Sequence, residues 1–187
     1  MKLISRFLVA LLILPAGLLG QTPAPPVPKG HGLYYQTPKA LVPIVGQAVA
    51  SARAGSPLSA AATFGLKSMK LNIEIAGERA ANNTDANPVF YYRPPWGTEA
   101  VGGSAGDLVL VRMNVKHKNR QVQVGAVGAL GANGGIATRA QVQVVRKQIE
   151  PGLYELSPAA PLKRGEYGFY LYRGYHLPGY VYDFSVE

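Results

Sequence analysis

The chain of 187 residues contains no cysteine. This absence excludes disulfide scaffolds, thiolate zinc sites, cysteine nucleophiles and a lipidated N-terminal cysteine. Charged residues are also scarce, at 16% of the chain, which is low for a soluble helical protein. Hydrophobic residues, by contrast, make up 48%, which is enough to form a core and excludes wholesale disorder.

Helical periodicity is almost absent from the sequence, whereas 22 glycines and 15 prolines supply many turns. Several segments instead alternate apolar and polar residues with the period of two that is typical of β-strands. The predicted strands are two within 32–45, followed by 69–75, 88–93, 108–116, 120–127, 141–149, 153–156, 166–172 and 180–186. We therefore predict an all-β fold in which two antiparallel sheets pack as a sandwich.

The first 20 residues are typical of a secretory signal peptide. Lys2 and Arg6 precede an unbroken apolar run, Phe7 to Leu14, which a proline ends and small residues follow. The run is shorter than the roughly 20 apolar residues that span a bilayer, so cleavage after Gly20 is favoured over a membrane anchor. Gln21 stands where a lipobox would need cysteine. We expect a secreted or periplasmic protein with no transmembrane segment after signal cleavage.

The mature chain is predicted to hold one domain behind a short tether. Residues 21–31 are proline-rich and should be extended, and residues 32–187 fit a single β-sandwich domain. Its first part, 32–60, is expected as a short N-terminal hairpin appendage. Within it, the alanine-rich stretch 46–59 is expected to form a short helix or a loop.

The clearest predicted hairpin joins 108–116 to 120–127 through a turn at 117–119. In its second strand, Val122 and Val124 are expected to point inward. The glycine-rich stretch 125–135 that follows is expected to be a connection.

One local motif bears on topology. Leu162-Lys163-Arg164-Gly165-Glu166-Tyr167 has the Leu-x-x-Gly-x-Tyr spacing of a tyrosine corner, in which the tyrosine hydroxyl bonds to backbone a few residues upstream. Leu162, Gly165 and Tyr167 are therefore predicted to be structural residues. The motif is typical of Greek-key β proteins, so an immunoglobulin-like sandwich is the expected topology.

Short stretches over most of the mature chain carry a family resemblance: Gly32 to Tyr35, Pro88 to Tyr92, Leu108 to Arg112, Arg120, Val122 to Gly125, Gly152 to Glu155, Pro161-Leu162, Gly165 to Phe169 and Val181 to Phe184. Through them the chain resembles a group of secreted bacterial β-sandwich proteins of unknown function. A more distant likeness is to immunoglobulin-like and fibronectin type III sandwiches. The resemblance implies a fold and a compartment and transfers no catalytic residue.

Recognisable catalytic motifs are missing from the sequence. No serine lies in a Gly-x-Ser-x-Gly elbow, and the glycine-rich stretches lack the lysine of a phosphate-binding loop. The three histidines share no local metal spacing. A site assembled from loop residues would draw on His117, His176, Asp107, Asp183 and Glu166, of which Asp183 is expected to face outward or reach a neighbouring turn. We predict no metal, no cofactor and no enzymatic activity.

Two groups of side chains are candidate binding surfaces. The first is basic and suits an anionic polymer. Its residues at the end of the clearest hairpin are Arg112, Lys116, Lys118 and Arg120, and Arg146 and Lys147 are expected elsewhere. The second surrounds the last hairpin turn, where exposed aromatic rings and cations suit a sugar, an acidic polymer or a protein. Its candidate binding residues are Tyr170, Tyr172, Arg173, Tyr175, His176 and Tyr180. In both cases the alternative is a purely structural role, as charges that block edge pairing or as cross-strand aromatic pairs.

Together these patterns predict a secreted or periplasmic module of the cell envelope that binds or supports other components without catalysis. Its candidate partners are an anionic polymer, a glycan or a protein. Nucleic acid is not expected, because the protein leaves the cytoplasm. The alternative is an envelope hydrolase or a metal-dependent enzyme that uses loop residues.

Overall fold

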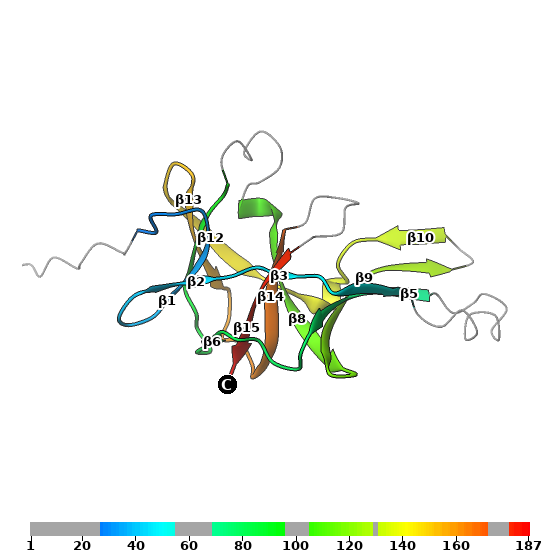
Figure 1. Ribbon diagram of the computed structural model, residues 1–187. Helices are drawn as coiled ribbons and strands as arrows, with labels where there is room; N and C mark the ends of the chain where they lie inside the picture. Colours follow the sequence, from blue (N-terminus) through cyan, green and yellow to red (C-terminus); the bar gives the residue numbers. More distant parts are fainter. Residues whose placement is uncertain (1–26, 55–68, 96–104, 129–130, 172–179) are drawn as a thin grey trace, which may run out of the picture.

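The structure is a computed structural model that describes residues 27–54, 69–95, 105–128, 131–171 and 180–187 (Figure 1). The predicted signal peptide and most of the predicted tether lie outside these residues. The described part consists of β-strands, arranged in two sheets, with two short 3-10 turns. Apart from one short parallel pair, the strands of both sheets pair antiparallel, so the predicted all-β class is confirmed.

The smaller sheet, sheet A, has five strands in the order β12-β13-β7-β1-β2. In chain order these are β1 (Gly32–Gln36), β2 (Leu41–Ile44), β7 (Phe90–Arg93), β12 (Val144–Glu150) and β13 (Leu153–Pro158). Its edges are therefore β12 and β2.

The larger sheet, sheet B, follows the order β3-β15-β14-β8-β9-β5-β4. Its main strands are β5 (Met69–Ala76), β8 (Leu108–Lys116), β9 (Asn119–Gly128), β14 (Gly165–Leu171) and β15 (Tyr180–Val186). The short strands β3 (Gln47–Ala48), β4 (Ser51–Ala54), β6 (Asn83–Thr84), β10 (Gly131–Gly134) and β11 (Gln141–Val142) add to it. The 3-10 turns η2 (Ala105–Asp107) and η3 (Thr138–Ala140) precede β8 and β11.

The main core lies between the two sheets. Phe90 of sheet A packs against Phe169 and Phe184 of sheet B, with ring centroids 5.1 and 4.9 Å apart. Leu33 and Leu156 of sheet A are buried in the same core. Burial of these apolar side chains is the main force that holds the sheets together.

A second core lies on the other face of sheet B. Because successive residues of a strand point to opposite faces, Tyr170 and Val181 point away from sheet A. They pack with Ile73 of β5 and Val122 of β9. In the sheet order, β8 and β14 separate β9 from β15, yet Arg120 of β9 bonds to Asp183 of β15. Sheet B therefore curls over on itself, and its central strands are buried on both faces.

Three sequence-based expectations are corrected by the strand pairing. The segment 32–60 is not an appendage in its described part, since β1 pairs with β7 and lies inside sheet A. The described residues of 46–59 form β3 and β4 rather than a helix or a loop. The stretch 125–135 is not only a connection, because β9 continues to Gly128 and pairs with β10.

The tyrosine-corner hydrogen bond is present at the start of β14. The Tyr167 hydroxyl donates to the carbonyl oxygen of Lys163 at 2.7 Å. Gly165 has a φ of +152°, and a Cβ there would lie 3.2 Å from the guanidinium of Arg112, so glycine suits this position on both counts. That guanidinium donates to the carbonyl oxygen of Arg164 at 2.9 Å. Two consecutive carbonyls of the β13–β14 connection are thus held by side chains of sheet B.

Candidate functional site

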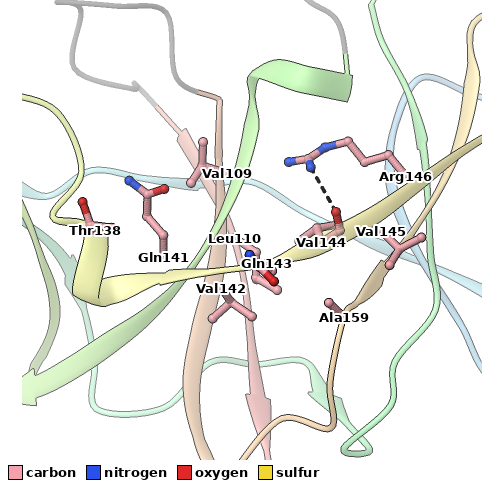
Figure 2. Close-up of a pocket in the computed structure, with 10 residues that line it drawn as sticks. All are labelled: Val109, Leu110, Thr138, Gln141, Val142, Gln143, Val144, Val145, Arg146 and Ala159. Atoms are coloured by element: carbon pink, nitrogen blue, oxygen red, sulfur yellow. Dashed lines mark hydrogen bonds between the residues drawn. The ribbon is translucent and has the colours of Figure 1, made fainter.

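A cleft of about 710 Å³ opens where the chain passes from sheet B to sheet A (Figure 2). Its walls come from β8, η3, β11, the first residues of β12 and Ala159. Figure 2 shows valines from β8, β11 and β12 around it, together with two glutamine side chains and Arg146. The cleft therefore combines apolar surface with amide groups and one cation.

The cleft exists because one extended segment belongs to both sheets. β11 pairs with β8 through Gln141↔Val111 and Val142↔Leu110. From Val144 onward the segment pairs with β13 in sheet A instead. The next stretch of β8, at Leu108, is thereby left without a strand on this side among the described residues.

Arg146 occupies the place of the missing strand. Its Nη2 donates to the carbonyl oxygen of Leu108 at 2.7 Å, and its Nε donates to that of Ala105 at 3.0 Å. Its Nη1 donates to the carbonyl oxygen of Val144 at 3.1 Å, the bond drawn in Figure 2. One guanidinium thus links η2 and β8 of sheet B to β12 of sheet A.

Arg146 also carries charge that is not neutralised by the described residues. No ion pair joins it to a carboxylate in the part of the chain that the structure describes. A guanidinium has five N–H donors, and the three carbonyls use one on each nitrogen, so further donors remain. Because Arg146 is an exposed residue, these donors can reach a ligand. A fixed guanidinium of this kind suits a carboxylate or a phosphate.

Sequence reasoning counted Arg146 among the bases outside the hairpin end and did not predict a site there, although the sequence carries a signal for that site. The alternation in Gln141-Val142-Gln143-Val144 breaks at Val145, where two valines are consecutive. In the structure this break follows the point at which the segment leaves sheet B for sheet A. A disturbed period of two within one predicted strand is what a change of sheet produces.

The predicted binding site at the last hairpin turn is described only at its two ends. Tyr172, Arg173, Tyr175 and His176 lie outside the described residues. Tyr180 is 64% exposed at the start of β15.

Tyr170 was expected on the surface and is fully buried, which is a correction. It lies in the second core, where its hydroxyl donates to Sδ of Met113 at 3.5 Å. The physical reason is that the curl of sheet B covers the face that should have met water.

The curl of sheet B also leaves some residues of the basic hairpin end exposed and buries another. Lys116 and Lys118 are exposed as expected. Arg120 is only 3% exposed and forms a buried ion pair with Asp183. The expectation that Asp183 faces outward is therefore wrong, since it is 1% exposed in the second core.

Two of the carboxylates considered for catalysis come together, but in a buried place. Nη1 of Arg120 bonds to Asp183 and lies 4.0 Å from the carboxylate of Glu166. Glu166 also accepts hydrogen bonds from the Ser185 hydroxyl at 2.8 Å and from the Ala80 N–H at 2.9 Å. Burial raises the pKa of Asp183, and Arg120 offsets part of that rise. These groups are buried between the curled strands of sheet B, and none of them lines the cleft at Arg146.

Other chemical centres do not emerge from the described residues. They contain no group of three or more His, Asp or Glu side chains placed to hold a metal ion. His117 lies in an exposed turn, and the ring of His31 contacts the carbonyl oxygen of Pro94 at 2.6 Å. Within the same residues, no helix has the length and apolar character needed to cross a bilayer.

Comparisons with known proteins add no assignment. No protein-family model, no curated protein and no solved structure matches this chain. The function therefore has to be argued from the cleft and its surroundings.

Proposed function

We propose that this protein is a non-catalytic binding module of the bacterial cell envelope, secreted or periplasmic and immunoglobulin-like in topology. Its cleft at Arg146 binds an anionic group of its partner. The carrying observation is the guanidinium of Arg146. Three carbonyl oxygens fix its position, it faces an open cleft, and no described carboxylate neutralises it. A prepositioned cation of this kind binds an anion without first having to be ordered.

The distribution of buried charge supports an anionic partner. The formal charge of +9 for the whole chain falls to +7 when the first 20 residues, which hold two bases and no acid, are removed. Glu74, Glu166 and Asp183 are buried, whereas Arg120 is the one buried base among the residues whose burial the structure describes. Burial thus removes more negative than positive charge from the surface. The exposed surface is accordingly more basic than the composition alone indicates, which attracts anionic polymers over a range of about 8–10 Å at physiological ionic strength.

The neighbouring side chains narrow the expected partner. Val109, Val142 and Val145 line the cleft beside Arg146. An inorganic anion would leave this apolar surface in water. A carboxylate carried on a partly apolar chain would cover it, and hydrophobic burial would then add to the charge-assisted hydrogen bonds.

Retention on immobilised poly-glutamate tests the proposal. Arg146→Gln should elute at clearly lower salt than the wild type, because the fixed cation is lost. Arg139→Gln is the matched control, since Arg139 is another exposed arginine, and its guanidinium donates to Gln123 at 2.7 Å. Both variants lose one positive charge. Equal elution of the two would mean that net charge alone retains the protein, and the proposed site would be rejected.

The proposed compartment has a separate test. The intact mass of protein recovered from the native envelope should place the mature N-terminus between Gly17 and Pro25, where small residues follow the apolar run. Retention of the segment from Met1 to Leu14 would contradict secretion with cleavage.

A further inference from the structure

We infer that the outer edge of β12 accepts an added β-strand from an extended, acidic polypeptide segment, which lies along the cleft and places a carboxylate on Arg146. This inference rests on the proposed function, because it names the partner of the same site. It commits to polypeptide as the source of the anion and to main-chain pairing as the mode of binding.

The register of sheet A shows which backbone groups of β12 face outward. The N–H of Ala159 donates to the carbonyl oxygen of Gln143 at 2.9 Å, so Gln143 points its backbone groups toward β13. Backbone groups of successive residues alternate in direction along an antiparallel strand. Val145 and Lys147 therefore also face β13, whereas Arg146 and Gln148 turn their N–H and C=O groups away from it.

The position of a proline agrees with this assignment. Pro158 is the partner of Val144, and proline has no N–H to donate. In the same alternation Val144 turns its backbone groups outward, so its pairing with Pro158 needs no N–H from the proline. The carbonyl oxygen of Val144 already accepts a hydrogen bond from the Arg146 side chain, which leaves the backbone groups of Arg146 and Gln148 to pair with an incoming strand.

The edge is open over this stretch. Val145 to Gln148 are four consecutive exposed residues, and Val145 is 55% exposed. No other strand of the described chain pairs with the outer side of β12. Val145 and Arg146 of this stretch also line the cleft, as Figure 2 shows, so an added strand has space beside this part of β12. The opposite edge of sheet A is less suitable because β2 contains Pro43.

The charges at this edge select an acidic partner. Arg146 and Lys147 lie on opposite faces of β12, because neighbouring residues of a strand alternate. Bases on an edge strand discourage pairing with a second copy, whose own bases would be brought close. An acidic strand reverses that effect. The shift of register between Gln148 and Glu150 ends the regular ladder and limits the partner to a short segment.

The test uses a capped hexapeptide of alternating valine and glutamate, measured by titration calorimetry with the full mature chain. We expect it to bind, and we expect the same peptide with lysine in place of glutamate to show no measurable binding. N-methylation of the amides along one edge of the acidic peptide should weaken binding by about tenfold or more, since the added strand then loses its main-chain donors. Equal binding of the N-methylated peptide overturns the inference.

A pair of protein variants tests the same point from the other side. Gln148→Pro removes an outward N–H and no hydrogen bond to β13, so it should abolish peptide binding while the melting temperature changes little. Gln148→Ala keeps the N–H and should bind as the wild type does. Should the proline variant fail to fold, the N-methylated peptide still decides the question.

The outcomes separate this inference from the proposed function. If Arg146→Gln lowers retention on poly-glutamate but N-methylation has no effect, the anion site stands and strand addition is wrong. If Arg146→Gln matches Arg139→Gln, both are wrong. Binding of the acidic peptide that is lost in Gln148→Pro and weakened in Arg146→Gln supports both.

Discussion

The guanidinium of Arg120 on β9 donates a hydrogen bond to the carboxylate of Asp183 on β15 in the second core. The same guanidinium donates to the carbonyl oxygens of Ala76 at 2.8 Å and Gly77 at 3.1 Å. One buried side chain thus joins the end of β5, the start of β9 and the middle of β15. These hydrogen bonds of Arg120 stabilise the curled form of sheet B.

Replacing Arg120 should therefore destabilise the fold strongly. Arg120→Met leaves Asp183 and Glu166 buried without their cation, and breaking a buried ion pair in this way costs about 3–5 kcal/mol. Urea denaturation measures the loss. Arg139→Met, at an exposed position, should change the free energy of unfolding by less than about 0.5 kcal/mol. A loss in Arg120→Met as small as that of the control would show that the hydrogen bonds and the ion pair of Arg120 contribute little to stability.

The pH dependence of stability should carry a signature of Asp183. Burial raises the pKa of its carboxyl group from 3.8, and Arg120 offsets only part of this effect. The folded protein therefore holds this proton more tightly than the unfolded chain does. The resulting stabilisation is present below about pH 3.8 and is lost as the pH rises through the folded-state pKa.

Comparison with Asp183→Asn isolates that signature, because asparagine does not titrate. The free energy of unfolding of the wild type, taken relative to the variant, should fall as the pH is raised from acid toward neutral. Denaturant unfolding at a series of pH values measures the difference. A relative rise with pH would mean that Arg120 outweighs burial and holds the pKa of Asp183 below 3.8.

The tyrosine corner gives a prediction of smaller size. Tyr167→Phe removes only the hydroxyl that donates to Lys163, and leaves a loop carbonyl without its partner. We expect the free energy of unfolding to fall by about 1–3 kcal/mol. Tyr182→Phe is the control, because in the described chain the Tyr182 hydroxyl forms no hydrogen bond. Equal effects of the two substitutions would make Tyr167 an ordinary core aromatic.

The strands and the corner could be predicted from the sequence because their signals are local. A period of two fixes which residues share a face, and Leu-x-x-Gly-x-Tyr fixes where a hydroxyl points. What failed was the assumption that one face of each strand meets water. Tyr170 and Asp183 were expected outside for that reason, and the curl of sheet B buries both. Long-range closure of this kind leaves no spacing in the sequence.

A weaker signal of two-sided burial was nevertheless present. Leu108 to Val111 are four consecutive apolar residues in β8, and they alternate between the two cores or their edges. An uninterrupted apolar run in a strand is typical of a strand covered on both faces. The cleft was not predictable to the same extent, since it depends on where the chain leaves β8 between β11 and β12, and only the break at Val145 marks that place.

Tyr91 should contribute to the loss of stability at high pH. Its hydroxyl donates to Oε2 of Glu155 at 3.1 Å and to Oε1 of Gln36 at 3.2 Å. Burial, together with the nearby Glu155 carboxylate, raises the pKa of Tyr91 from 10.0 to about 12. The stabilising effect of this proton is complete below about pH 10 and is lost as the pH rises through 12.

An alkaline titration followed by ultraviolet absorbance tests this assignment. The wild-type curve minus that of Tyr91→Phe should show one phenol ionising near pH 12, and the variant should lose less stability between pH 10 and 12. Tyr180→Phe, which removes an exposed hydroxyl, serves as the control for the loss of one chromophore. A difference curve centred near pH 10 would contradict the proposed environment of Tyr91.

The β8–β9 turn stores backbone strain that substitution should release. His117 and Lys118 have φ values of 52° and 62°, and Lys116 pairs directly with Asn119. Two left-handed residues in a two-residue hairpin loop form the turn that favours Asn-Gly. A left-handed conformation costs a residue with a Cβ roughly 1–2 kcal/mol, and glycine avoids this cost. Because unfolded glycine has more conformational freedom to lose on folding, about 0.5–1 kcal/mol of that gain is lost again.

The double variant His117→Asn, Lys118→Gly should therefore raise the free energy of unfolding by about 1 kcal/mol, as measured by urea denaturation. Lys116→Gly is the matched control, because Lys116 lies in a β-strand, where glycine is expected to lower stability. A double variant less stable than the wild type would mean that the native side chains at this exposed tip make contacts worth more than the strain they impose. The turn would then be held by those contacts, and its left-handed backbone would be their consequence.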